Sequence, residues 1–214
     1  MKLPLHRVKR GARNDRSAFT LIEMIGVLAV IAILASMLIP RVFEAINSAR
    51  VNATAVGCET IKTAVADHYG KYGQFDLRFG TTPVTFNGNF SANYDTNLMI
   101  EGLLDKPFSA KIAGGDPSTN ALIELVKPAS ANAPAGNGGL GYALDGVNVA
   151  TTNALVVEAV LYGVTAADAK DLNDRIDGTA LGAPDLSTAD NKGRVEYAQP
   201  TSGATTVYIY LTHR

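Results

Sequence analysis

Side chains that could do chemistry are few and scattered in this chain of 214 residues. The three histidines, His6, His68 and His213, are far apart in the sequence, and the single cysteine, Cys58, has no evident base beside it. The sequence contains no G-x-S-x-G, P-loop, H-E-x-x-H or C-x-x-C motif. These observations argue against an enzyme, and a lone cysteine excludes an intrachain disulfide. We expect Cys58 to be a buried, inert side chain.

Aspartates form the only cluster that suggests a ligand. They recur every third residue in the stretch that we expect to be helical, and two more follow in the next loop: Asp168, Asp171, Asp174, Asp177, Asp185 and Asp190. Oxygen clusters suit Ca²⁺, but the spacing is not that of an EF-hand, and acidic runs on helices are usually solvated faces. Calcium is therefore a weak alternative to having no cofactor, with Asp177, Asp185 and Asp190 as its candidate ligands.

Glu23 is the most unusual charge in the sequence. It is the only ionisable residue in the apolar segment 19–39, FTLIEMIGVLAVIAILASMLI. As a helix this segment would span about 31 Å, close to the thickness of the hydrocarbon core of a bilayer. A carboxylate at the centre of a bilayer costs roughly 2.5–3.5 kcal/mol, and less near the interface. A simple anchor gains nothing from that cost.

Charge is distributed unevenly about this segment. Residues 1–18 contain six Lys or Arg and one acid, whereas the remainder has a net charge of −6. The positive-inside rule therefore predicts a single-pass chain with residues 1–18 in the cytoplasm and the rest outside. A secretory signal peptide and a plain signal anchor are the alternatives, but the apolar run is longer than a usual signal-peptide core. The nearly balanced total charge of −1 argues against a nucleic-acid binder.

Cleavage between Ala18 and Phe19 would give Glu23 a purpose. The cut creates a positive amino group on Phe19, four residues from Glu23. In a stack of staggered helices, Glu23 of one subunit could pair with the amine of its neighbour. Breaking a buried pair leaves an uncompensated charge, which would make the pair specific for one arrangement of subunits.

Residues 17–23, Ser-Ala-Phe-Thr-Leu-Ile-Glu, resemble the processing site of type IV prepilins and type II secretion pseudopilins. The resemblance implies cleavage before Phe19 by a membrane peptidase that also methylates the new amine. Counted from Phe19, Glu23 and Pro40 fall at the fifth and twenty-second positions, which the family uses for subunit docking and for a helix bend. The family usually has Gly before the cut, where this chain has Ala18. The resemblance covers about the first quarter of the chain.

The same resemblance implies the partners and the location. The partners would be further pilins, in homo- or hetero-oligomers, the prepilin peptidase and methylase, an inner-membrane assembly platform and membrane lipid. The chain would lie in the cytoplasmic (inner) membrane and then in a periplasmic or extracellular filament. Some pseudopilins bind calcium in a C-terminal loop. The lack of a cysteine pair departs from the C-terminal disulfide loop of pilus subunits and favours a pseudopilin.

An α+β, pilin-like fold is expected. Its parts would be a leader (1–18), a transmembrane or filament-core helix (19–40), an amphipathic stem helix (41–69) and a globular head (70–214). Pro40 would bend the helix or end it. The stem stripe is expected to comprise Val42, Ile46, Ala49, Ala53, Val56, Ile61, Ala64 and Val65, and the helix to stop at Gly70 or Gly73.

The head should be a small antiparallel sheet packed on the stem. Strands are predicted at 121–126, 153–164, 194–198 and 205–212, with a possible extended piece at 84–86. Helices are predicted at about 96–104 and from Thr165 to Ile176, and residues 128–141 read as a loop. The function expected is that of a structural filament subunit. The alternative is an unprocessed, membrane-anchored binding protein that does not polymerise.

Overall fold

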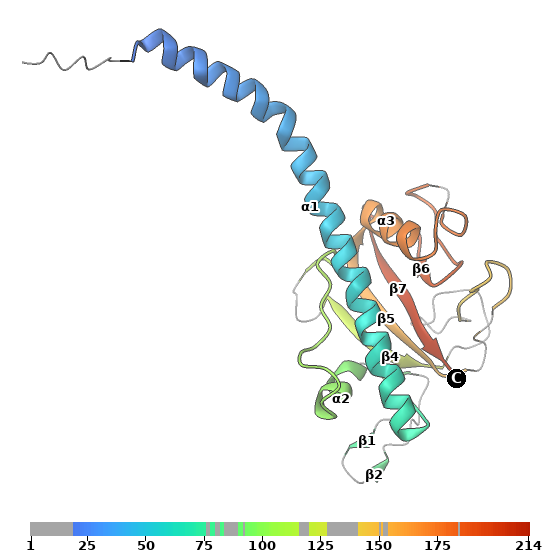
Figure 1. Ribbon diagram of the computed structural model, residues 1–214. Helices are drawn as coiled ribbons and strands as arrows, with labels where there is room; N and C mark the ends of the chain where they lie inside the picture. The colour runs from blue at the N-terminus through green and yellow to red at the C-terminus, as the bar shows by residue number, and fades with distance from the viewer. Residues whose placement is uncertain are drawn as a thin grey trace, which may run out of the picture. The chain divides into compact units, whose positions relative to one another are not determined.

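The computed structural model describes residues 19–75, 78–79, 82–83, 90–91, 93–115, 120–127, 141–149, 151, 154–183 and 185–214. The chain divides into two compact units, the first ending at Glu44 and the second running from Ala45 to Arg214. One helix, α1 (Leu21–Tyr72), contributes to both units. Its first part makes up the helical portion of the first unit, and its second part is the stem of the globular unit (Figure 1).

Helix α1 is 52 residues long and contains Pro40 in its interior. The alternative that Pro40 ends the helix is therefore wrong. The helix ends one residue before Gly73, which adopts a φ of +72° and donates its N–H to the Tyr69 carbonyl at 2.7 Å. Glycine takes this left-handed conformation without the steric cost that a side chain would bring, so it is the usual residue after a helix. The predicted stop at Gly70 or Gly73 is confirmed.

The stem does bury one stripe, but not the stripe expected from apolar residues alone. Its buried residues are Val51, Thr54, Cys58, Ile61, Ala64, Val65 and His68. Of the predicted stripe, Ile61, Ala64 and Val65 are buried. The others are exposed: Val42, Ile46, Ala49, Ala53 and Val56, the last with an exposed fraction of 66%. Thr54 takes part in its place because the hydroxyl donates to the Arg50 carbonyl at 3.1 Å, so burying this polar side chain leaves no unpaired group. A prediction based only on which residues are apolar therefore gave part of the stripe the wrong position on the helix.

The head contains a five-stranded antiparallel sheet in the order β3-β4-β5-β7-β6. The strands are β3 (Phe90–Ser91), β4 (Ala121–Val126), β5 (Val156–Thr165), β6 (Val195–Tyr197) and β7 (Ala204–His213). A separate pair is formed by β1 (Arg78–Phe79) and β2 (Thr82–Pro83). Two short helices complete the fold, α2 (Tyr94–Ile100) and α3 (Ala166–Ile176). The four predicted strands and the two short helices are confirmed, with ends shifted by a few residues.

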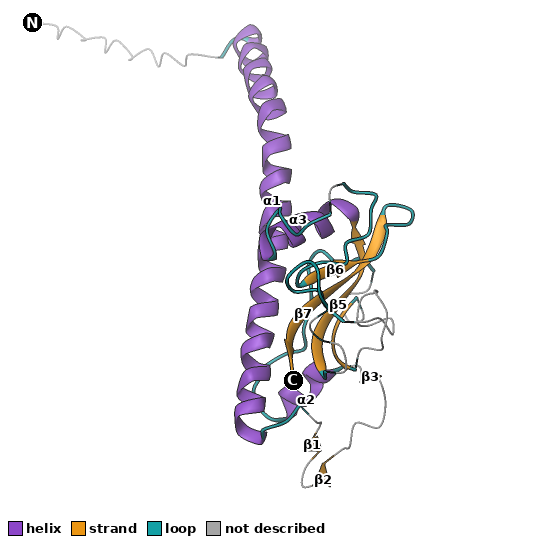
Figure 2. Ribbon diagram, turned by 90° about the vertical axis from the view of Figure 1, so that its right-hand side faces the viewer, coloured by secondary structure: helices purple, strands orange, loops and turns teal. Residues whose placement is uncertain are grey.

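Each long strand buries both of its faces, because the sheet lies between the stem and a layer of loop. Ile123, Ala159 and Ile209 face the stem and share one core cluster with Ile61 and Val65 of α1. The stem runs along this face in both views of the ribbon (Figures 1 and 2). On the other face a smaller cluster joins Val126, Val156, Val160 and Tyr208 to Tyr142 of the loop. This alternation is the period of two that strands impose.

Helix α3 begins as its sequence predicted. The Thr165 hydroxyl oxygen accepts the backbone N–H of Asp168 at 3.2 Å, which satisfies one of the free donors of the first turn. The extended piece predicted at 84–86 lies outside the described residues, as does all of the predicted loop 128–141 except Gly141.

Candidate processing and assembly site

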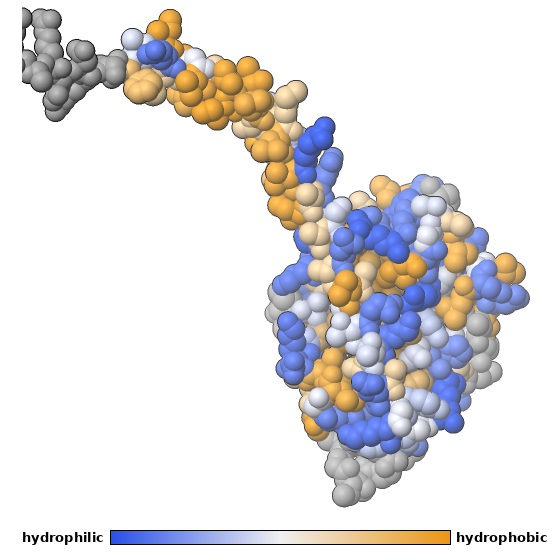
Figure 3. Space-filling model, viewed as in Figure 1, coloured by the Kyte–Doolittle hydropathy of each residue, from blue (hydrophilic) through white to orange (hydrophobic). Residues whose placement is uncertain are grey.

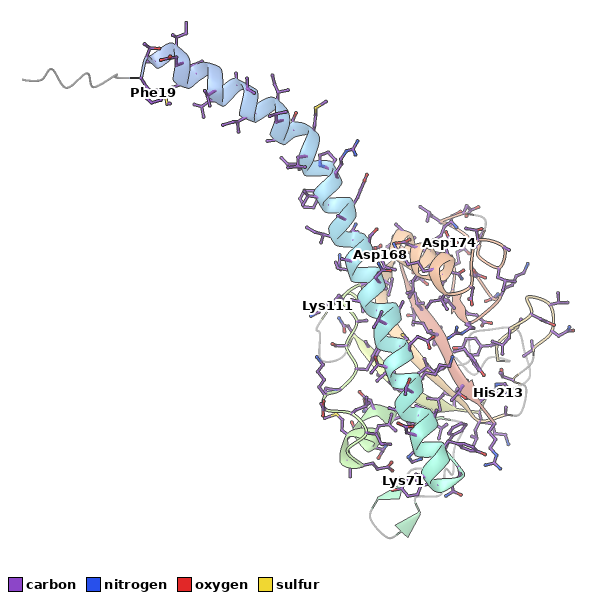
Figure 4. All side chains as sticks on the ribbon, viewed as in Figure 1. Phe19, Lys71, Lys111, Asp168, Asp174 and His213 are labelled. Carbon is purple, nitrogen blue, oxygen red and sulfur yellow. The ribbon has the colours of Figure 1, made fainter. Side chains whose placement is uncertain are left out.

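The proposed processing site stands at the very start of the described chain. Phe19 and Thr20 precede the first helical residue, Leu21, and the Phe19 side chain is 78% exposed. Figure 4 shows Phe19 at the free end of α1. Ala18, the residue before the predicted cut, lies outside the described residues. Phe19 therefore lies outside the helix, with its side chain exposed.

Glu23 caps its own helix. Its carboxylate oxygen Oε2 accepts the Thr20 backbone N–H at 2.9 Å and the Thr20 hydroxyl at 2.8 Å. The Glu23 N–H in turn donates to the Thr20 hydroxyl oxygen at 3.3 Å. This reciprocal pairing of an N-cap threonine with a glutamate three residues later is a capping box. The carboxylate is thereby turned back toward the N-terminal end of α1. It is bonded to the backbone N–H of Thr20, the residue that follows Phe19.

Thr20 is a positioning residue that sequence reasoning missed. The signal was present, because Thr20-Leu-Ile-Glu23 has the spacing of a capping box and stands directly before an apolar run. Among the described residues, no lysine, arginine or histidine forms an ion pair with Glu23. The Glu23 carboxylate is therefore held in place by hydrogen bonds and has no counter-ion among the described residues.

The first part of α1 has no partner for its apolar surface within the described residues. Leu28, Ile33 and Leu38 are all more than 60% exposed, and no side chain of α1 before Val51 is buried. The space-filling view shows this part of the helix as a nearly continuous apolar surface (Figure 3). By length and composition it can cross a membrane. An uncovered apolar helix requires lipid or other helices around it.

Pro40 interrupts the backbone hydrogen bonding of this helix without ending it. A proline has no N–H, so the Ser36 carbonyl lacks its usual donor four residues on. The Ser36 hydroxyl is itself turned toward the helix and donates to the Ile33 carbonyl at 2.7 Å. The helix is therefore weakest about Ser36 to Pro40, where a bend is predicted.

Comparison with known families supplies the missing context for these features. Residues 13–39 match the family model described as the prokaryotic N-terminal methylation motif. The start of the chain is a methylation motif. This motif is characteristic of the type IV pilin and pseudopilin family, and the match covers the first part of the chain only. The matched range includes Ala18, Phe19 and Glu23 and ends directly before Pro40. No curated protein and no solved structure matches the chain.

Beyond the methylation motif, arginines join the head to the stem. Arg50 of α1 donates to the Lys111 carbonyl through Nη2 at 2.5 Å and through Nε at 3.0 Å. Arg175 of α3 donates to the Asn52 side chain at 2.5 Å, and Arg194 pairs with Glu59 at 2.9 Å. These contacts lie on either side of the buried stripe, so they fix how the head is seated on the stem.

The three calcium candidates are occupied by hydrogen bonds within the protein. Asp177 Oδ2 accepts the backbone N–H groups of Arg194 and Val195, both at 2.7 Å. Asp190 Oδ2 accepts the Ala183 N–H at 2.7 Å, and Asp185 Oδ1 accepts the Ser187 N–H at 2.8 Å. Nowhere in the described ranges do three or more His, Cys, Asp or Glu residues form a group able to hold a metal ion. The carboxylates thus act as caps for loops in this structure.

Cys58 is buried in the stem, as predicted. Burial raises the pKa of its thiol to about 12, with a smaller contribution from the neighbouring Glu59 carboxylate. The reactive form of cysteine is the thiolate, so this side chain is a packing residue.

Proposed function

We propose that the chain is a structural subunit of a type IV pilus-like or type II secretion pseudopilus filament. In this proposal a prepilin peptidase cuts between Ala18 and Phe19, and the amine of Phe19 is methylated. The subunit waits in the inner membrane, with its head outside, and is added to the filament by an assembly platform. Other pilins, of the same or a different kind, surround α1 in the filament.

The observation that carries the proposal is the capping box at the start of an uncovered apolar helix. Thr20 holds the Glu23 carboxylate near Phe19, and no cation in the described part of the chain neutralises it. Cleavage before Phe19 creates a cation of the right sign at this end of the helix. A neighbouring subunit would then supply the missing charge partner, and its helix would cover the apolar surface.

Mass spectrometry of the mature protein tests the processing step. We expect an N-terminus at N-methyl-Phe19 when the chain is made together with a prepilin peptidase. A chain that keeps Met1, or one that begins after Ile39, would contradict the proposal. The unprocessed, anchored binding protein is the alternative that a retained Met1 would favour.

Electron microscopy of sheared material tests assembly separately. Glu23→Gln keeps the hydrogen-bonding shape but removes the charge, and breaking a buried ion pair costs roughly 3–5 kcal/mol. We therefore expect Glu23→Gln to abolish filaments while the mature N-terminus remains at Phe19. Glu44→Gln, another exposed carboxyl of α1, is the matched control and should form filaments. Normal filaments from Glu23→Gln would show that charge pairing is not the basis of assembly.

A further inference from the structure

Three glutamates are buried together on the face of the sheet that points away from the stem. Glu124 lies in β4, Glu158 in β5 and Glu196 in β6, and their exposed fractions are 2%, 0% and 1%. Glutamate is among the residues that are least often fully buried unless paired. The methylation motif does not involve this face, and the proposed filament function does not use it.

These carboxyls are close enough to affect one another. Glu124 stands directly opposite Glu158 in the register of β4 and β5. Like charges directly opposite each other destabilise a sheet. On the other side of Glu158, strand β7 places Tyr210 opposite Glu158 and Tyr208 opposite Glu196. The three carboxyls therefore share one face with two tyrosines.

Residues 141–149, here named the latch, pack on this face through Tyr142 and Leu144. The buried Tyr142 donates its hydroxyl to Glu158 Oε2 at 2.6 Å, and the Ala143 N–H donates to Glu196 Oε1 at 3.3 Å. Two further bonds hold the same segment, from the Tyr142 N–H to the Thr151 hydroxyl oxygen at 2.7 Å and from the Gly193 N–H to the Ala143 carbonyl at 2.8 Å. The latch thus has one direct bond to each of two buried carboxyls.

No positive charge in the described part of the chain balances the three glutamates. None of them forms an ion pair with a lysine, arginine or histidine among the residues that the structure describes. Tyr142, Tyr162 and Tyr208 interact electrostatically with these carboxyls, and Asp177 and Asp190 act on Glu196. Lys192 lines the same cavity as Glu196, and Arg194 acts on Tyr210, whose hydroxyl contacts His213 Nδ1 at 2.5 Å. Glu158 Oε1 is buried and has no hydrogen-bond partner among the described residues. Ionising this face would therefore place several negative charges in a dry environment.

We propose that the latch is a pH-sensitive element, held against the sheet while Glu124, Glu158 and Glu196 carry protons and released from it when they ionise. The structure shows the closed state. Neutral carboxyls can be buried beneath Tyr142, whereas carboxylates on adjacent strands repel each other and need water. Displacing the latch is the least costly way to admit water, because it leaves the ladder of β4, β5 and β7 intact.

The direction of the pH effect follows from the burial of these groups. Burial raises the pKa of Glu124 to about 7 and that of Glu196 to about 8, and it raises the pKa of Glu158 well above its usual value. The hydrogen bonds from the Tyr142 hydroxyl to Glu158 and from the Ala143 N–H to Glu196 lower these pKa values, but burial is the larger effect. In the unfolded chain the same carboxyls ionise near their ordinary pKa of 4.5. Between pH 4.5 and 8 the unfolded or open form therefore binds fewer protons than the closed form. The closed form is favoured at acidic pH and loses stability as pH rises through this window.

Hydrogen exchange of the full-length protein in detergent micelles tests the proposal. Amide protection in residues 141–149, corrected for the intrinsic pH dependence of exchange, should fall at least ~10-fold from pH 5 to pH 8, since a carboxyl whose pKa differs by one between two forms can bias their equilibrium tenfold. Protection of β5 and β7 should change far less. Glu158→Gln mimics the protonated carboxyl at the centre of the cluster, so the loss of latch protection from pH 5 to pH 8 should be clearly smaller than in the unaltered protein. Glu124→Gln, at the neighbouring position, provides the same test if Glu158→Gln fails to fold.

Asp105→Asn is the control, because Asp105 is an exposed carboxyl of the head and should behave as the unaltered protein does. Equal loss of protection in the latch, β5 and β7 would overturn the proposal, since the whole head would then respond to pH. Constant protection in the latch from pH 5 to pH 8 would also overturn it. Recovery of latch protection at pH 8 on addition of calcium chloride would overturn it as well, by showing that the carboxylates bind a cation instead of protons.

Discussion

Single carboxylates hold several turns of this protein in place, and Asp177 is the clearest case. One oxygen of Asp177 accepts two backbone N–H groups at the start of β6, those of Arg194 and Val195. Burial raises the pKa of this carboxyl, although the two hydrogen bonds and the nearby Arg194 act in the opposite direction. A side chain that satisfies two otherwise buried donors is expected to be needed for stability, whatever its relation to calcium.

We predict that Asp177→Ala destabilises the head by about 1–3 kcal/mol, because it leaves backbone donors without an acceptor. Asp177→Asn keeps an acceptor oxygen and should be much milder. Chemical denaturation of the three proteins measures the difference. Asp185→Ala, which removes an exposed carboxylate with only local bonds, should change the free energy of unfolding by less than about 0.5 kcal/mol.

The same variants test calcium at this loop. We expect calcium chloride to leave the melting temperature of the unaltered protein unchanged, because hydrogen bonds from backbone N–H groups already occupy the three candidate carboxylates. A rise in melting temperature that disappears in both Asp177→Ala and Asp185→Ala would establish a calcium site there.

At the scale of the elements, α3 depends on its cap. Thr165 ends β5 and caps α3, so it connects the sheet to the helix whose Arg175 reaches the stem. We predict that Thr165→Ala destabilises the head by about 1 kcal/mol, the usual cost of losing an N-cap hydroxyl. For a domain of this size that lowers the melting temperature by about 2–4 °C.

Thr165→Ser is the matched variant for this prediction. Serine retains the hydroxyl that accepts the Asp168 N–H, so most of the lost stability should return. Thermal unfolding followed by circular dichroism measures both variants. If alanine and serine lower the melting temperature equally, the methyl group of Thr165 and not its hydroxyl is what matters.

How far the elements could be predicted depended on whether their signals were local. The 121–126 strand, the helix from Thr165 to Ile176 and the stop at Gly73 were all predictable, because a β-branched run, a capping threonine and a glycine act on their own neighbours. The buried stripe of the stem was predicted only in part: Ile61, Ala64 and Val65 are buried as expected, whereas Val51 and Thr54 are buried by what the head places against them. The three buried glutamates were missed for the same reason. Each reads as a solvated charge until the loop at Tyr142 covers it.

At the candidate site, most of the residues could be predicted from the sequence, but their contacts could not. Glu23 could be selected as the single charge in an apolar segment, and Phe19 and Pro40 from their spacing to it together with the resemblance to prepilins. The family comparison agrees, since Phe19 and Glu23 lie inside the methylation motif. Thr20 was overlooked because its role appears only when the helix start is fixed. No charge partner of Glu23 lies among the described residues, and in the proposed filament that partner belongs to another subunit.

At the scale of the whole molecule, the two parts of α1 differ in what they do. The second part helps to form the core of the head, and the first part presents an apolar surface. Every buried side chain in the described part of the chain lies at Val51 or beyond, whereas the apolar residues before Glu44 are exposed. The buried core of the head is therefore built from residues of the second unit, and the described residues of the first unit do not cover their own apolar surface. A subunit of this kind can fold its head before assembly and still present an uncovered apolar helix.

We predict that residues 45–214, made without the first unit, form a soluble, folded monomer. The stem keeps its buried stripe in this fragment, and the arginines that join stem to head, Arg50, Arg175 and Arg194, all remain. Size-exclusion chromatography should give the size of a monomer without detergent, and the near-ultraviolet circular dichroism of the tyrosines should show a packed core. The full chain, with its uncovered apolar helix, should need detergent under the same conditions. A fragment that aggregates, or that has helical signal without tyrosine signal, would mean that the head depends on residues before Ala45 for its packing.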